Sequence, residues 1–183
     1  MNANQKAKAE ARFQLLKKQL VVAIQILESD VKFAETEWLK NKSSQFWERT
    51  LIRCCCAWVE GSLSLLKQFA LEIAEYSGAK LNGKDMEVLT ELRIDRNSIN
   101  KPAFLPISKN IKETFKVFIK ARKIQREIKY DDSRFTDLCD TFELRNKLMH
   151  PKKQQDLGIS VKMHEAAERG VDWFNEKFRE VHN

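Results

Sequence analysis

The residues best suited to chemistry in this sequence stand together between Arg145 and His150, in the run RNKLMH, with Pro151 directly after it. Histidine is the side chain that most readily gives and takes protons near neutral pH. The planar guanidinium of an arginine binds oxyanions through a pair of N–H donors. Residues four apart touch along a helix, so Asn146 can contact His150. The run therefore combines a proton-transfer group with an anion-binding group.

One helix is predicted to carry these residues. The run Asp131-Asp132-Ser133 offers an N-cap, and the helix is expected to span 134–149. Pro151 disfavours helical geometry at His150, so the helix should end there. At ~100° per residue, Arg145, Asn146 and His150 are predicted to share a broad face with apolar residues, namely Phe135, Leu138, Cys139, Phe142 and Met149. A second apolar strip, Leu144 and Leu148, is expected on the far side.

Polar groups on such a face must be paired, wetted by a cleft or directed at a partner. One interpretation is a functional site. The other is a capping cluster in which His150 closes the helix and Arg145 pairs with an acid such as Glu60 or Glu143. The spacing of the residues does not separate these two interpretations.

Two segments resemble the HEPN superfamily. Arg145 and Asn146, followed after three residues by His150, resemble its motif of an arginine, a polar residue, and a histidine after four to six intervening residues. The run 57–63, in which Glu60 interrupts apolar residues, is similar to the buried second helix of many such domains. The chain departs from the compact family pattern by its long first helix and by a Pro-containing insertion between Ser77 and Ser108.

The resemblance implies a helical domain that forms a homodimer with two motifs facing one cleft. It further implies RNA cleavage through the ribose 2′-OH, without a metal or other cofactor. His150 would exchange protons with the 2′-OH or the leaving 5′ oxygen, and Arg145 would hold the phosphate. Asn146 would orient His150 or bind a phosphate oxygen, with Glu60 in a supporting role. The family further implies a prokaryotic toxin or defence effector that cuts transfer or messenger RNA, with a possible cognate antitoxin or regulatory protein.

A rival hypothesis from another class is a non-catalytic, HEPN-like dimerisation or RNA- or partner-binding module. In it, the motif stabilises a dimer interface and a basic segment holds a partner. A third hypothesis is a helical scaffold without a nucleic-acid ligand.

Positive charge is concentrated in one segment. The chain carries a net charge of +7, and residues 101–130 contain nine basic residues against two acidic ones. Such a local excess suits a polyanion-binding surface, although a solvated lysine face has the same composition. The candidate RNA-backbone contacts are Lys147, Lys152 and Lys153 beside the motif and a stripe at Lys112, Lys116, Lys120 and Lys123.

The fold class is predicted to be all-α, an up-and-down bundle of about five or six helices. An all-β fold needs frequent turns, so the presence of only 5 Gly and 3 Pro in 183 residues favours a few long helices instead. Apolar residues recur at intervals of three and four, which predicts helices at about 4–39, 44–76, 85–92, from 109, 134–149 and 160–181. We expect a single domain over 1–183, with an irregular insertion at about 77–108.

The remaining residue types favour ordinary packing. Cys54 to Cys56 and Cys139 fit neither a disulfide framework nor a metal site and are interpreted as small buried side chains in a reducing compartment. His164 lies on an apolar helix face and is predicted to be a packed core histidine. No apolar run approaches the ~20 residues of a membrane span. No signal peptide is recognised, so a cytoplasmic protein without membrane contact is expected.

Overall fold

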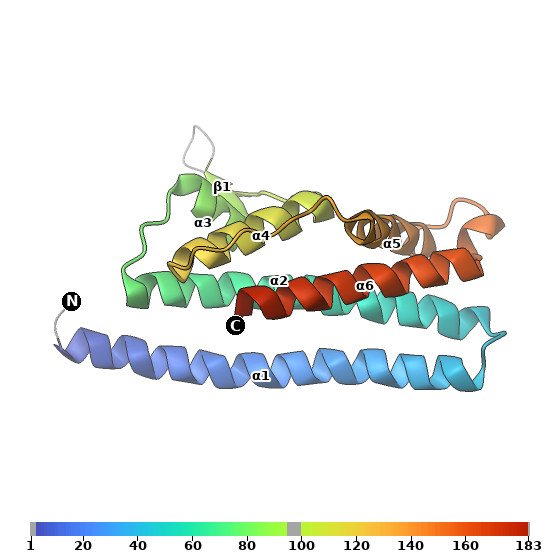
Figure 1. The fold of residues 1–183 in the computed structure, drawn as a ribbon, viewed down its shortest axis with the longest axis horizontal. Coiled ribbons are helices and arrows are strands. Elements are labelled where there is room, and N and C mark those ends of the chain that lie inside the picture. The colour runs from blue at the N-terminus through green and yellow to red at the C-terminus, as the bar shows by residue number, and fades with distance from the viewer. Residues whose placement is uncertain (1–2, 95–99, 183) are drawn as a thin grey trace. The chain divides into compact units, whose positions relative to one another are not determined.

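The computed structural model describes residues 3–94 and 100–182, and most of them are helical (Figure 1). Within these ranges there are six α-helices: α1 (Ala3–Lys40), α2 (Gln45–Ser77), α3 (Gly83–Thr90), α4 (Ile107–Ala121), α5 (Ser133–Met149) and α6 (Val161–His182). A short 3-10 helix, η1 (Gln154–Leu157), follows α5. The prediction of an all-α bundle with about five or six helices is confirmed.

The chain divides into two compact units, each described here by itself. The first contains Met1–Val22 and Ser62–Glu127, and the second contains Ala23–Gly61 and Ile128–Asn183. Both units therefore take one part of α1 and one part of α2. No helix within the described ranges 3–94 and 100–182 combines the length and apolar character that a membrane crossing requires.

The first unit contains α3 and α4 with a small hairpin between them. Asn82 caps α3 by accepting a hydrogen bond from the backbone N–H of Asp85, whose carboxylate accepts one from the Asn82 N–H in return. The strands β1 (Leu92–Ile94) and β2 (Asn100–Pro102) pair antiparallel, so part of the segment at about 77–108 that was expected to be an irregular insertion is regular. The fully buried Ile111 and Phe115 form the inner face of α4.

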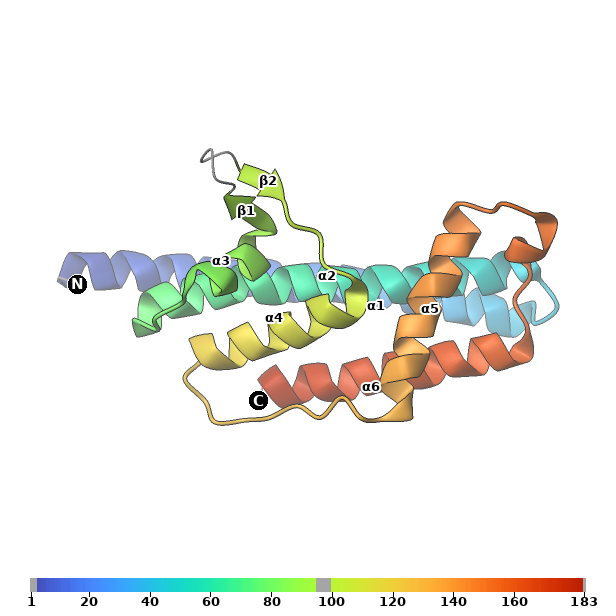
Figure 2. The same cartoon turned by 90° about the horizontal axis from the view of Figure 1, so that it is seen from above.

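The second unit is built around α5 and α6, which cross each other (Figure 2). The two helices come so close that a Cβ added to Gly170 would lie 2.5 Å from the backbone nitrogen of Leu138. The fully buried Trp173 of α6 packs against Phe135 of α5, with ring centroids 4.8 Å apart. Gly170 thus allows the two helices to approach closely enough for Phe135 and Trp173 to pack against each other.

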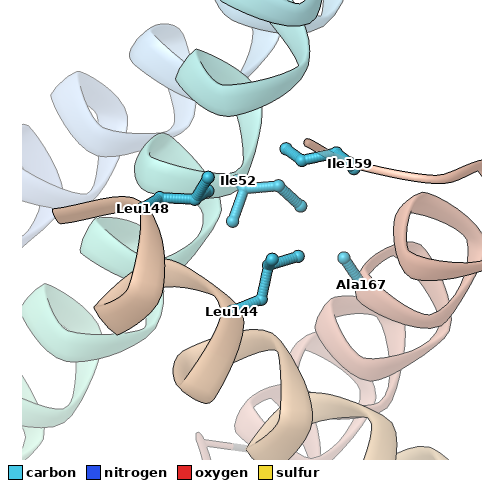
Figure 3. Packing of buried hydrophobic residues seen from close by; sticks show 5 residues of the cluster. All are labelled: Ile52, Leu144, Leu148, Ile159 and Ala167. Atoms are coloured by element: carbon cyan, nitrogen blue, oxygen red, sulfur yellow. The ribbon is translucent and has the colours of Figure 1, made fainter. Parts of the chain in front are cut away.

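The end of α5 that carries the candidate site packs against α2. In Figure 3 the Leu144 and Leu148 side chains point toward Ile52 of α2, beside Ile159 and Ala167. All five side chains are buried. This apolar cluster determines which side of the last two turns of α5 faces the interior.

Both ends of α5 lie where the sequence predicted them. The Asp132 carboxylate accepts a hydrogen bond from the N–H of Arg134 at 2.9 Å and caps the first turn. His150 leaves helical geometry, with φ −131° and ψ 62°, while its N–H still donates to the Asn146 carbonyl oxygen at 3.0 Å. Pro151 therefore follows directly after the helix, as its effect on the preceding residue requires.

Candidate functional site

The candidate site lies at the C-terminal end of α5 and consists of Arg145, Asn146 and His150, called the motif residues below. Arg145 is half-buried, and its Nη2 donates a hydrogen bond to Oε1 of Glu60 on α2. Its guanidinium carbon lies 5.4 Å from the centre of the Phe142 ring. A cation over an aromatic face and beside a carboxylate is held by two favourable electrostatic contacts. The position of Arg145 is therefore determined by both α2 and α5.

The pairing with Glu60 joins two residues that the sequence singled out separately. Glu60 interrupts the apolar run of α2, and its side chain is 50% exposed. Glu60 was expected either to support the site or to pair with Arg145 in a capping cluster. The pair agrees with both interpretations.

Asn146 and His150 are exposed, which corrects the predicted face. Met149, expected among the core residues, is 51% exposed, whereas Leu144 and Leu148, expected on the far side, are 7% and 2% exposed. Phe135, Leu138 and Phe142 of the first strip are buried as predicted. In the last two turns of α5, however, Leu144 and Leu148 pack against Ile52 and face the interior. Asn146 and His150 consequently point away from the core of this chain.

No described residue makes a side-chain hydrogen bond with Asn146 or His150. They lie four apart, at the last turn and the C-cap of α5, beside the half-buried Arg145. An imidazole, an amide and a guanidinium thus occupy one helix end, where the first two are open to a ligand or to another chain. The imidazole can transfer a proton, and the guanidinium can bind an oxyanion.

Two arginines of α2 that sequence reasoning missed hold the backbone around the motif. Nη2 of Arg53 donates to the carbonyl oxygen of Leu148, and Nη1 of Arg49 donates to that of Leu157, each at 3.2 Å. One turn earlier, Gln45 exchanges two hydrogen bonds with the backbone of Ile159, at 2.8 and 3.0 Å. The signal in the sequence was the spacing of four between these polar residues, which places them on one face of α2.

The lysines nearest the motif are exposed. The loop after Pro151 is closed by Asp156, whose carboxylate accepts hydrogen bonds from the backbone N–H groups of Lys152 and Lys153 at 2.9 and 3.1 Å. The side chains of Lys147, Lys152 and Lys153 all lie on the surface. These three cations thus remain available for contacts with an anion near the motif residues.

The lysine stripe belongs to the other compact unit and includes three residues of α4 and Lys123, which follows the helix. Two of its lysines have local partners. Nζ of Lys120 lies 2.5 Å from the Asp85 carboxylate, and Nζ of Lys123 donates to the Ser77 carbonyl oxygen at 2.5 Å. Lys116 is exposed and lies 4.0 Å from Glu113 on the same helix, and Lys112 is also exposed. Lys120 and Lys123 therefore contribute to the packing of their own unit, a role that the charge count did not predict.

All four cysteines are free thiols, and the prediction that they are buried holds for Cys55 and Cys56 but not for Cys54 and Cys139, which are only partly buried. Cys55 and Cys56 are buried, and burial raises the pKa of the Cys56 thiol to about 12 despite the nearby Arg145. In the part of the chain that the structure describes, no three His, Cys, Asp or Glu side chains converge so that they could hold a metal ion.

Comparison of the chain with protein-family models, with curated proteins and with solved structures gave no match.

Proposed function

We propose that the chain is a metal-independent endoribonuclease of the HEPN type, acting as a homodimer. The observation that carries the proposal is the arrangement at the end of α5. Glu60 and Phe142 hold Arg145 in place, while Asn146 and His150 have exposed side chains without a partner among the described residues. A site with a positioned anion-binding group and an open proton-transfer group suits a phosphodiester substrate.

In this mechanism Arg145 and His150 have different roles. Arg145 binds the scissile phosphate and stabilises the charge that develops on it, while Glu60 keeps the guanidinium in place. His150 takes the proton of the ribose 2′-OH or gives one to the leaving 5′ oxygen. Attack of the 2′ oxygen on phosphorus breaks the bond to the 5′ oxygen and leaves a 2′,3′-cyclic phosphate. One chain leaves His150 exposed to water, so a second copy would enclose the reacting groups and supply the second proton-transfer histidine.

RNA contacts beyond the scissile phosphate are assigned to cations near the motif. Lys147, Lys152 and Lys153 are exposed and would bind neighbouring phosphates, with affinity that falls as salt rises. Lys112 and Lys116 are exposed candidates from the other unit. The role as a toxin or defence effector, with a cognate antitoxin or regulatory protein, rests on the family resemblance.

The test is cleavage of a mixed RNA substrate by purified protein in EDTA. We expect products with 2′,3′-cyclic phosphate ends, and a loss of activity of at least ~100-fold in His150→Ala, the usual range for a general acid or base. Met149→Ala, which also changes an exposed side chain at this helix end, should retain activity. Cleavage that requires Mg²⁺, or that continues at full rate in His150→Ala, would contradict the mechanism.

A second candidate function is a non-catalytic dimerisation or partner-binding module. Two hydrogen bonds that hold the end of α5 against α2 favour it. Arg145 donates to Glu60, and Arg53 donates to the Leu148 carbonyl oxygen. This alternative predicts no RNA cleavage by wild type and a marked loss of thermal stability in Arg145→Ala. The nuclease hypothesis instead predicts an active wild type and a His150→Ala variant that melts like wild type, because His150 is exposed.

A further inference from the structure

Positive charge is divided unequally between the two compact units. The first unit contains 18 basic residues against 9 acidic ones, and the second contains 15 against 17. The first unit thus has a net charge of +9 and the second one of −2, although the motif residues belong to the second. A local excess of cations attracts polyanions. The first unit is consequently the one whose charge favours a nucleic-acid strand.

Helix α4 presents part of this charge on its outer side. At ~100° per residue, Lys109, Lys112 and Lys116 fall within a band of ~60°, and all three are exposed. The opposite side of the helix carries the fully buried Ile111 and Phe115. Successive lysines of the band lie ~4.5–6 Å apart along the helix axis. A row of cations with this spacing can contact successive phosphates of a nucleic-acid backbone.

Phe104 lies three residues before the start of α4, in the segment that connects β2 to this helix (Figure 2). At 82% exposure it is the most exposed large apolar side chain among the described residues. The segment is fixed at both ends, because Pro102 ends β2 and Pro106 is the N-cap of α4. Between them, the N–H of Ala103 donates to the Glu91 carbonyl oxygen at 2.8 Å. The chain therefore presents this ring to solvent on a well-held segment.

The ring and the cations together suit a single nucleic-acid strand. Phe104 and Lys109 are five residues apart, so the chain between them spans at most ~18 Å. Exposed aromatic rings stack on unpaired bases with little sequence preference, while cations contact the phosphates. In a duplex the bases already stack on one another and offer no face to the ring. A membrane surface would require a broader apolar face than one phenylalanine provides.

We propose that α4 and the segment before it bind a single strand of nucleic acid, with Phe104 stacked on an unpaired base. Lys109, Lys112 and Lys116 contact the phosphates of the neighbouring nucleotides. The phosphate contacts weaken as salt rises, whereas the stacking contact distinguishes a single strand from a duplex. This binding requires no cleavage, so it does not depend on the proposed nuclease activity.

The experiment is a fluorescence-anisotropy titration of a fluorescein-labelled oligothymidylate with the full chain. This probe has no 2′-OH group, so the proposed nuclease mechanism cannot cut it. Phe104→Ala should weaken binding of the single strand about tenfold, as expected for one lost stacking contact. The same variant should bind the duplex with oligodeoxyadenylate as wild type does. Phe46→Ala, at another exposed phenylalanine, is the matched control and should bind both probes like wild type.

Lysine variants test the position of the phosphate contacts. Lys109→Gln combined with Lys116→Gln should reduce the slope of log affinity against log salt by about 1.4, since each phosphate contact on a single strand contributes ~0.7. Lys17→Gln combined with Lys18→Gln removes the same charge from α1 and should leave the slope unchanged. All the substituted side chains are exposed, so these variants are expected to fold.

Several outcomes would overturn the proposal. They are an absence of oligothymidylate binding by wild type, equal binding by Phe104→Ala and Phe46→Ala, and equal salt slopes in the two double lysine variants. Tighter binding to phosphatidylserine vesicles than to oligothymidylate would likewise assign this surface to a membrane instead. Loss of RNA cleavage with oligothymidylate binding retained would count against the nuclease function alone.

Discussion

The Glu60 carboxylate accepts a hydrogen bond from the Arg145 guanidinium, across 85 residues of sequence and between two helices. The Arg145 side chain is 24% exposed and that of Glu60 is 50% exposed. An ion pair of this exposure contributes little to stability, typically ~0–1 kcal/mol. Its larger effect is geometric, because it determines where the guanidinium lies relative to the end of α5.

Glu60→Gln tests this positioning role. The substitution keeps the shape of the side chain and removes its charge, so we expect the free energy of unfolding to change by less than ~1 kcal/mol. Under the proposed nuclease function, RNA cleavage should fall about tenfold, since a poorly positioned catalytic group loses rate steeply. Urea denaturation and initial cleavage rates measure the two effects. Glu143→Gln, at an exposed position of α5, is the control and should cleave RNA like wild type. If Glu60→Gln also cleaves RNA at the wild-type rate, Glu60 does not position Arg145 for catalysis.

Gly170→Ala tests the close crossing of α5 and α6. Alanine has the higher helix propensity, by ~1 kcal/mol. The added Cβ would nevertheless meet backbone atoms of Leu138 at 2.5 and 2.6 Å, and a backbone cannot move aside as a side chain can. We therefore expect a net loss of ~1–3 kcal/mol in the free energy of unfolding.

Gly158→Ala provides the matched control for Gly170→Ala. The nearest atom to its added Cβ would be the Gln155 carbonyl oxygen at 3.6 Å, an ordinary contact. Chemical denaturation of both variants should show a loss only for Gly170→Ala. If the two variants have the same stability, the helices are not as close at this crossing as described.

Asp85→Asn tests the pH dependence of the first unit. Burial opposes ionisation of Asp85, but the hydrogen bonds from Lys120 and from the Asn82 backbone outweigh it, so its pKa in the folded chain is lowered. A lowered folded pKa means that the carboxylate stabilises the fold above the unfolded pKa of ~3.9. This contribution is lost as the pH falls through the folded value.

The expected result is that Asp85→Asn is less stable than wild type at pH 7, by ~1–2 kcal/mol for a lost charged hydrogen bond. The difference between the two proteins should shrink as the pH is lowered below ~4. Urea denaturation at several pH values measures it. Asp131→Asn, at an exposed position, should match wild type throughout, and a difference for Asp85→Asn that does not change with pH would contradict the assignment.

Local chemistry made several features predictable from the sequence. The two ends of α5 depend on Asp132 and Pro151, which act on backbone groups within a few residues. The apolar period predicted α6 and the burial of His164, because a helix repeats its contacts every three to four residues. Glu60 stood out because a single charge interrupts a buried run of α2.

The sequence by itself thus determined the helical fold class, the ends of α5 and the position of Arg145, Asn146 and His150 at its C-terminal end, since all of these follow from neighbours along the chain. Only the tertiary structure decided which side of the last two turns of α5 is buried, where Leu144 and Leu148 face the interior and Met149 does not. Two strips of similar character satisfy the same periodicity, and the choice depends on Ile52 and Ala167, which are far away in sequence. For the same reason the hydrogen bonds from Arg53 to the Leu148 carbonyl and from Lys120 to the Asp85 carboxylate could not be predicted, because each joins distant segments.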